Sequence, residues 1–309
     1  MNRTRKIINL QAFASGDNNN QNIKQYQMEF KKLIQAVFKA QSYFADFFGG
    51  EIEAMDGVQE NETAFYVKTS DIPVVVGTYS KDANTAMGTG TGKSSRFGNR
   101  TEVIYTNTPV NYSWGWSFHE GIDRATVNNS FDDAVADRLD LQAQAKTREF
   151  NKHHSSFIST SAGKTIASGQ AKITKDNVAD VFAQLDAYFT DIEAVGTRIA
   201  TVNSTVWNAI IDSGLTTTSK GSSVNVDKNI IEDFKSFTIK KAPSGYFQTN
   251  EVIYAYIAGV GKAFTGINTA RTIESEDFDG VALQGLGKAG EYISNDNKKA
   301  VAKVTVTGA

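Results

Sequence analysis

The chain of 309 residues contains no cysteine and only three histidines, His119, His153 and His154. Without cysteine it can form neither a disulfide framework nor a metal site built on thiolates. Neighbouring side chains on a helix point about 100° apart, so His153 and His154 cannot clamp one metal ion as an i, i+4 pair would. We therefore expect no metal and no other cofactor.

The sequence also lacks an excess of one charge and a long apolar run. A formal net charge of −2 argues against a surface built mainly to coat nucleic acid. Arg3, Arg5 and Lys6 either make weak contacts with phosphates, blind to sequence, or simply solubilise the N-terminus. No apolar run approaches the roughly 18 residues that a membrane span needs, and no signal peptide is evident. We expect a soluble protein made in the cytoplasm, with no membrane partner.

A glycine-rich segment, residues 87–95, resembles a phosphate-binding loop because it ends in Gly92-Lys93-Ser94. A Walker A loop places four residues between its two glycines, whereas Gly88 stands one residue too close to Gly92. No helical pattern follows the lysine. We interpret the segment as a solvated loop tip and expect no enzyme. A P-loop-like nucleotide-binding enzyme that uses Gly88–Ser95 is the alternative from a different class.

A second set of residue types for catalysis is Ser117, His119 and Glu120. Adjacent residues in a strand point to opposite faces, so His119 and Glu120 cannot act together, and we expect no catalytic site there. Residues 275–280 resemble the start of a calcium loop, but Leu286 stands where that loop needs a glutamate. We expect a turn joining two strands.

The first third of the chain predicts an arm, a helix and a long hairpin. Residues 1–20 are polar, and residues 22–48 carry apolar side chains at steps of three and four, which predicts a helix that Gly49-Gly50 stops. Its aromatic side chains, Tyr26, Phe30, Phe44 and Phe47 among them, are expected to pack on the same domain or on another subunit.

Strand-like runs follow at residues 64–67, 72–76 and 101–110, around a tip of residues 77–100 with almost no core-forming side chains. An alternating aromatic run then predicts one unbroken strand over residues 110–118. A two-stranded hairpin is marginal in water, so this one is expected to rest on a partner surface.

The remainder alternates between helical and strand patterns. A helix is predicted from Asn129 or Ser130 to about Phe157, then a linker over residues 159–169 that marks a domain boundary. Thr174 is expected to cap a third helix that reaches Ile192. Later elements are a strand at 198–202, a helix at 204–211, a polar loop at 213–228, and strands at 237–239, 251–258, 270–273, 281–283 and 300–306. Helices and strands in separate blocks predict an α+β fold.

Three aspartates, Asp133, Asp137 and Asp140, share one face of the second helix. Such a stripe is either simply solvated or matches a basic patch on a neighbouring subunit.

The order of these elements resembles the major capsid proteins of tailed bacteriophages, which have the Hong Kong 97-type capsid fold. The C-terminal segments that strengthen the resemblance are Phe264-Thr265-Gly266-Ile267, Arg271-Thr272-Ile273-Glu274, Gln284-Gly285-Leu286-Gly287-Lys288-Ala289-Gly290-Glu291-Tyr292-Ile293 and Asn297-Lys298-Lys299-Ala300.

The resemblance implies an N-terminal arm and helix (1–50), an extended hairpin loop that lies across an adjacent subunit (51–117), and a peripheral domain with a long spine helix (118–162). An α/β axial domain (163–260) would meet its copies around five-fold and six-fold axes, and residues 261–309 would return to the peripheral domain as strands.

The implied function is that of a structural protein whose pentamers and hexamers form an icosahedral shell around double-stranded DNA, contacted weakly and non-specifically. Its location is the virion capsid, assembled in the host bacterial cytoplasm. The expected partners are a scaffolding protein, a portal and decoration proteins. The scaffold is expected to be a separate protein, because the chain begins with Met and leaves no room for a fused one. Candidate contacts between subunits are Lys81, Lys93, Arg96 and Arg100, together with the aspartate stripe. An encapsulin-like nanocompartment shell is the alternative with the same fold.

Overall fold

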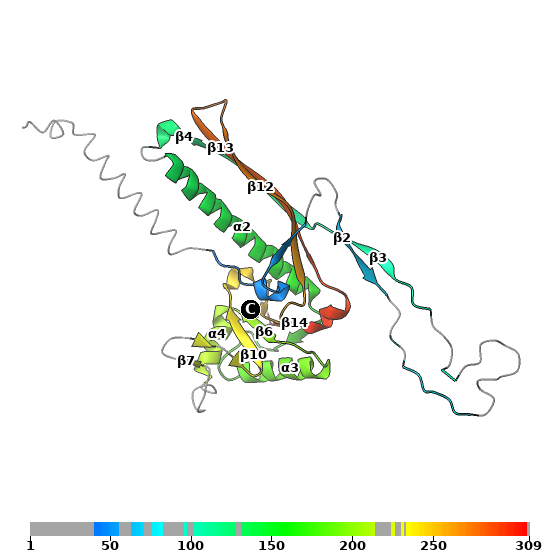
Figure 1. The fold of residues 1–309 in the computed structure, drawn as a ribbon. Coiled ribbons are helices and arrows are strands. Elements are labelled where there is room, and N and C mark those ends of the chain that lie inside the picture. Colours follow the sequence, from blue (N-terminus) through cyan, green and yellow to red (C-terminus); the bar gives the residue numbers. More distant parts are fainter. Residues whose placement is uncertain are drawn as a thin grey trace, which may run out of the picture.

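The computed structural model describes residues 40–55, 63–70, 74, 76–82, 96–97, 102–127, 131–213, 224–225, 230–231 and 233–307. Two sheets and one long helix organise them (Figure 1). The helix α2 (Phe131–Ser161) lies along a four-stranded sheet and reaches a six-stranded sheet at its C-terminal end. The mixture of helices and strands confirms the predicted α+β class.

The four-stranded sheet has the order β1 (Ile52–Ala54), β12 (Lys262–Glu274), β13 (Gly280–Tyr292) and β4 (Trp114–Asp123). The turn predicted between two strands is confirmed, since the Ser275 N–H donates to the Gly280 carbonyl at 2.9 Å. The strands predicted at 270–273 and 281–283 were too short. In β13 glycines obscured the alternating pattern: Gly285 and Gly287 lie under the rings of Phe118 and Trp116, where a Cβ atom would clash.

The six-stranded sheet contains β5 (Lys164–Ala167), β14 (Val301–Thr305), β11 (Glu251–Ile257), β6 (Arg198–Val202), β10 (Phe237–Lys241) and β9 (Asp233–Phe234), in that order. One face packs on α3 (Val178–Asp191) and α4 (Ser204–Asp212) through side chains such as Ile253 and Ala255. The other face packs Tyr254 and Tyr256 against Phe44, Phe47 and Ile158. Alternate side chains of β11 thus pack into two different hydrophobic cores, one on each face of the sheet.

Several predicted boundaries in this region were wrong. The linker expected at 159–169 contains the end of α2 and the edge strand β5, whose only buried residue is Ile166. A strand with one buried side chain gives little apolar signal. The third helix begins at Val178, after a turn in which the Asn177 side chain accepts a hydrogen bond from the Thr174 N–H. By contrast, β6 and α4 lie where they were predicted, with Asn203 capping α4 through the Val206 N–H.

The helix predicted over residues 22–48 falls largely outside the described residues, and its last part is wrong. Residues 40–44 are not helical, and only the 3-10 turn η2 (Ala45–Phe48) follows. Contacts with α2 replace helical hydrogen bonds here: the Tyr43 N–H donates to Asn151 Oδ1, and Asn151 Nδ2 donates to the Gln41 carbonyl. Gly49 ends the turn in the left-handed conformation, as the sequence predicted.

The β2 (Thr63–Thr69) and β3 (Thr106–Asn111) strands pair antiparallel and project from the body of the molecule (Figure 1). The strand predicted from residue 101 begins at Thr106, and Val74 and Val76 are not in a strand. The unbroken strand expected over 110–118 is interrupted at Tyr112 and Ser113, where the chain passes from the hairpin into the four-stranded sheet. The elements not yet given are η3 (Arg124–Thr126), β7 (Val224–Asn225), β8 (Ile230–Ile231), η4 (Ser244–Tyr246) and η5 (Asp296–Ala300).

Candidate functional site

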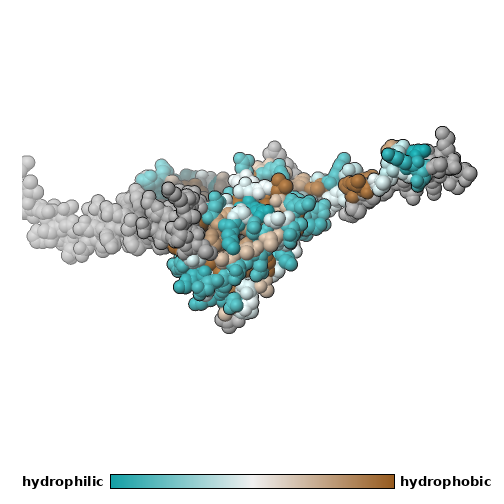
Figure 2. Space-filling model, turned by 90° about the horizontal axis from the view of Figure 1, so that it is seen from below, coloured by the Kyte–Doolittle hydropathy of each residue, from teal (hydrophilic) through white to brown (hydrophobic). Residues whose placement is uncertain are grey.

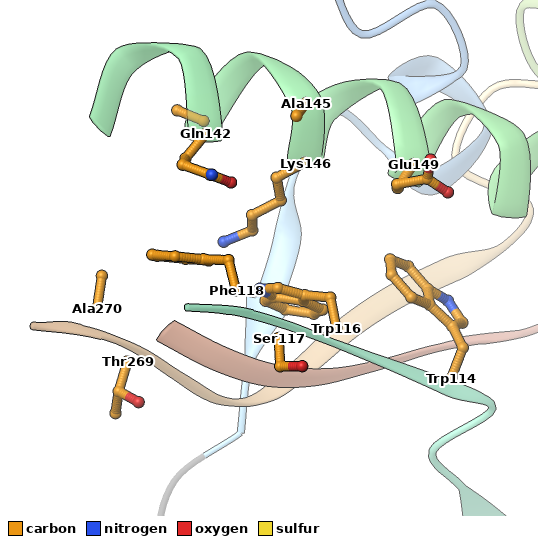
Figure 3. Close-up of a pocket in the computed structure, with 11 residues that line it drawn as sticks. Trp114, Trp116, Ser117, Phe118, Gln142, Ala145, Lys146, Glu149, Thr269 and Ala270 are labelled. Atoms are coloured by element: carbon orange, nitrogen blue, oxygen red, sulfur yellow. The ribbon is translucent and has the colours of Figure 1, made fainter. Parts of the chain in front are cut away.

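A pocket of about 320 Å³ lies between α2 and the four-stranded sheet (Figure 3). The even-numbered side chains of β4, Trp114, Trp116 and Phe118, face the helix and form one wall. Gln142, Ala145, Lys146 and Glu149 of α2 line the other side, and Thr269 and Ala270 of β12 close one end. The pocket is therefore an aromatic surface with a few polar groups at its rim.

Lys146 is the charged group that enters this pocket from α2. Its Nζ atom lies 4.6 Å from the centroid of the Trp116 ring and 6.0 Å from that of Phe150. Burial lowers the pKa of Lys146, but a cation over an aromatic face gains electrostatic attraction. The lysine thus packs its stem between helix and sheet and does not have the exposed position of a surface lysine.

A second contact ties the N-terminal half of α2 to the sheet. Arg138 donates from Nε and Nη2 to the two oxygens of Glu120 on β4, at 2.5 and 2.6 Å. This paired hydrogen bond is the main cause that lowers the pKa of Glu120. His119, the neighbour of Glu120, instead contacts Gln284 on β13 at 3.2 Å. The expectation that His119 and Glu120 point to opposite faces of the strand is confirmed, since they contact different elements.

The two adjacent histidines of α2 also have separate surroundings. His153 stacks on the Trp114 ring with centroids 3.9 Å apart and planes 5° apart. His154 is buried beside Phe48 and Phe150. Burial, followed by the charge of His153, lowers the pKa of His154 to about 3. Among the described residues, no group of three or more acidic, histidine or cysteine side chains could hold a metal ion.

The projecting hairpin carries apolar side chains that the same chain leaves uncovered. Tyr66, Val76 and Phe97 are 66%, 92% and 82% exposed, and hydrophobic surface recurs along the arm that leaves the body (Figure 2). At the root of the hairpin, Phe65 contacts the rings of Phe264 and Tyr292. Exposed apolar surface of this kind marks an interaction site.

The predicted contact residues of the hairpin are only partly described. Lys81 is exposed, and Arg96 donates from Nη1 to the Ser80 carbonyl at 3.1 Å. Lys93 and Arg100 lie outside the described residues, as does the glycine-rich segment 87–95, so its geometry as a phosphate loop is not tested.

The predicted aspartate stripe lies on α2, about half a turn away from the side that faces the sheet. Asp133 and Asp140 are exposed and Asp137 is half-buried, while Asp140 Oδ2 accepts a hydrogen bond from Gln144 Nε2 at 2.8 Å. Of the aromatic residues expected to pack the N-terminal segment, Phe44 and Phe47 are fully buried in their own chain. Tyr26 and Phe30 lie outside the described residues.

Sequence reasoning missed three charged residues at internal positions: Lys146, Glu291 and Glu251. Glu291 lies at the end of β13 with a side chain that is 4% exposed. Glu251, on β11, accepts hydrogen bonds from Ser159, Tyr254 and Lys303. The sequence signal for such a residue is a charged side chain on the apolar face of a helix or strand. This signal does not identify the residue with which the charge pairs.

Comparisons with known proteins give matches in structure only. No protein-family model matches the chain, and no curated protein matches it in sequence. A structure from Mycobacterium phage Che8 is 16% identical, with a TM-score of 0.63 over 88% of this chain and 94% of the other. The mature capsid of bacteriophage PhiM1 is 11% identical, with a TM-score of 0.65 over 88% and 89%. A virus-like particle from Pyrococcus furiosus is 14% identical, with a TM-score of 0.52 over 88% and 95%.

Proposed function

From the Hong Kong 97-type capsid fold that the chain shares with these structures, we propose that it is the major capsid protein of a tailed phage. Many copies of it form an icosahedral head shell that encloses double-stranded DNA. The observation that carries the proposal is the match with phage capsid structures over 88% of the chain. A structural role, without catalysis, follows from the same likeness.

The mechanism that we propose is burial distributed over many contacts. A single chain leaves the apolar side chains of the hairpin exposed, and a two-stranded hairpin is marginal without support. Contact with an adjacent subunit covers that surface. Closed symmetry repeats each weak contact many times, so the shell is stable although no single contact is strong.

The division into an N-terminal arm, an extended loop, a peripheral domain and an axial domain is part of this proposal. The four-stranded sheet with α2 corresponds to the peripheral domain, and the six-stranded sheet with α3 and α4 to the axial domain. The strand β14 pairs with β5 and β11 in the six-stranded sheet, so the C-terminal strands are divided between the two sheets. Pentamers and hexamers would form through the axial domain.

The partners and location that we propose follow from the same function. Packaged DNA is contacted weakly, in line with the net charge of −2. A separate scaffolding protein and a portal assist assembly in the host bacterial cytoplasm, and decoration proteins bind the finished virion capsid. The described residues include no helix that is long and apolar enough to cross a membrane.

Electron microscopy of the purified protein, combined with size-exclusion chromatography, tests the proposal. We expect closed shells, with or without added scaffold, and poor assembly of a soluble variant that lacks residues 80–98. Monomers or small oligomers under all conditions would contradict a shell. Shells filled with a protein cargo and free of nucleic acid would favour a nanocompartment, and nucleotide binding that is lost in Lys93→Ala would favour an enzyme.

We further propose that Lys81 and Arg96 of the hairpin face the aspartate stripe of an adjacent subunit, and a charge-reversal series tests this contact. Lys81→Glu with Arg96→Glu on the hairpin is expected to reduce shell yield about ten-fold, because it places like charges opposite the aspartate stripe. Asp133→Lys with Asp137→Lys is expected to restore the yield in combination. Lys175→Glu, an exposed site before α3, is the matched control. Loss of assembly without rescue would show that the hairpin contacts a different surface. It would not contradict the proposal that the protein forms a shell.

A further inference from the structure

A buried carboxylate holds the point at which the hairpin leaves the body. Glu291 Oε1 accepts a hydrogen bond from the Trp114 indole N–H at 3.1 Å, and Oε2 accepts one from the Ser113 hydroxyl at 3.0 Å. These two residues follow β3 and begin β4. The Ser113 backbone N–H also donates to the Ala289 carbonyl at 3.0 Å. One side chain of β13 therefore holds two consecutive residues, Ser113 and Trp114, at the joint between hairpin and sheet, which we define as residues 112–114.

A second group faces the same carboxylate from α2. His154 Nε2 lies 3.7 Å from Glu291 Oε1, and the histidine side chain is 3% exposed. Within the described part of the chain, neither ring nitrogen of His154 has a hydrogen-bond partner. A buried polar group in that condition costs free energy, and a small rotation of Glu291 would relieve it. The carboxyl group thus has two competing sets of partners.

Few other titratable groups act on this pair. From α2, His153 stacks on Trp114 and its charge influences both members. The joint contributes Tyr112, whose buried hydroxyl has no hydrogen-bond partner within the described residues and whose pKa is raised by burial, so it stays neutral in acid. From η2 the packed side chain is Phe48, while Asp46 pairs with Lys240 at 2.9 Å. The nearest charged residue of β13, Lys288, alternates to the other face of the sheet.

We propose that Glu291 and His154 form a proton-sensitive latch at the root of the β2–β3 hairpin. As a carboxylate, Glu291 holds Ser113 and Trp114. When it takes up a proton from solvent, its new O–H turns to donate to the free ring nitrogen of His154. The oxygen that faces His154, Oε1, then no longer holds the Trp114 indole, and the hairpin changes its angle to the body. The latch acts within one chain and does not depend on the proposed shell.

The order of protonation supports this direction. Burial raises the pKa of Glu291, whereas burial lowers the pKa of His154 to about 3. On acidification the carboxylate therefore takes up the first proton, and the imidazole stays neutral and able to accept a hydrogen bond. A neutral pair that shares one proton also avoids an uncompensated charge in the interior.

The absence of cysteine allows a direct test with two spin labels. Lys68→Cys on β2 and Ser156→Cys on α2 are exposed positions, and labelled chains are diluted with unlabelled protein so that only distances within one chain are measured. Between about pH 7.5 and about pH 4, a range that lies above the pKa of His154, we expect the distance distribution to shift. Glu291→Gln is expected to show the acid distribution at about pH 7.5, and the matched control Glu149→Gln, an exposed carboxylate of α2, to behave as wild type.

A second variant keeps the test decisive if Glu291→Gln folds poorly. His154→Leu retains the hydrogen bonds to Ser113 and Trp114 but removes the alternative partner, so its distances are expected to stay constant between the two pH values. Circular dichroism confirms that each variant is folded. Wild-type distances that do not change with pH, or a His154→Leu protein that shifts as wild type does, would overturn the latch.

Discussion

Replacing His154 with leucine should make the protein more resistant to acid, and the size of the effect follows from the surroundings of the histidine. Its side chain is buried between Phe48 and Phe150, with no hydrogen-bond partner within the described residues. Protonation would place a positive charge in that site, which is why its pKa falls from 6.5 to about 3. Leucine has a similar volume, favours helix and does not titrate.

The sign of the effect comes from comparing the folded and unfolded chains. Below about pH 6.5 the unfolded chain binds a proton at His154, while the folded protein does not do so until the pH approaches 3. Stability is therefore lost as the pH falls through this window. Each pH unit corresponds to about 1.4 kcal/mol, so wild type should lose roughly 2 to 3 kcal/mol relative to His154→Leu between about pH 6.5 and pH 4.5.

The difference between the two proteins, rather than the wild-type curve alone, removes the contribution of every titratable group that does not contact His154. Glu291 has a raised pKa, so the folded protein takes up a proton there more readily than the unfolded chain, and the carboxyl acts in the opposite direction. Urea unfolding followed by circular dichroism, at one fixed protein concentration, gives the free energy of unfolding at each pH. His119→Gln, at an exposed position, is the matched control, because it removes a histidine that is not buried.

The reasoning would be refuted by a stability difference between wild type and His154→Leu that stays within about 0.5 kcal/mol over this pH range, close to the usual precision of such comparisons. In that case the histidine is either protonated in the folded protein or reached by solvent.

Three further substitutions test the packing of the two sheets, each by thermal unfolding. Lys303→Met should lower the free energy of unfolding by roughly 3 kcal/mol, because it leaves the Glu251 carboxylate buried without its ion pair at 2.7 Å. Adding Glu251→Gln should recover part of that loss. Purely additive effects in the double variant would argue against the ion pair. Gly287→Ala should cost about 1 to 3 kcal/mol, since its Cβ atom would clash with the Trp116 ring, and an unchanged melting temperature would show that the ring can move. Phe47→Ala should cost about 3 to 5 kcal/mol, because the side chain is fully buried; a loss below about 1 kcal/mol would place Phe47 outside the core.

Local patterns in the sequence were sufficient for elements whose burial repeats regularly. The predicted helix that became α2 has an apolar side, and Phe150 on that side is buried against Trp114 and Trp116. The even-numbered aromatic residues of β4 alternate with small ones, and this strand lies against the helix as alternation requires. In these elements the polarity of each residue indicates whether its side chain faces the core or the solvent.

Local patterns failed where a distant segment decides the conformation. The strand β13 was underestimated because Gly285 and Gly287 read as breaks, although they accommodate rings from β4. The edge strand β5 exists because β14, far along the chain, pairs with it. Both depend on neighbours that no short window of sequence contains.

The sequence by itself determined the positions of β6 and α4, the absence of thiol chemistry and the aromatic side of β4, because composition and periodicity follow directly from residue identity. Only the tertiary structure decided that Glu291 would meet Ser113, Trp114 and His154, and that Lys146 would lie over Trp116. Those contacts join residues that are far apart in the chain. Burial strengthens their hydrogen bonds and shifts their pKa values, and burial is a property of the folded structure.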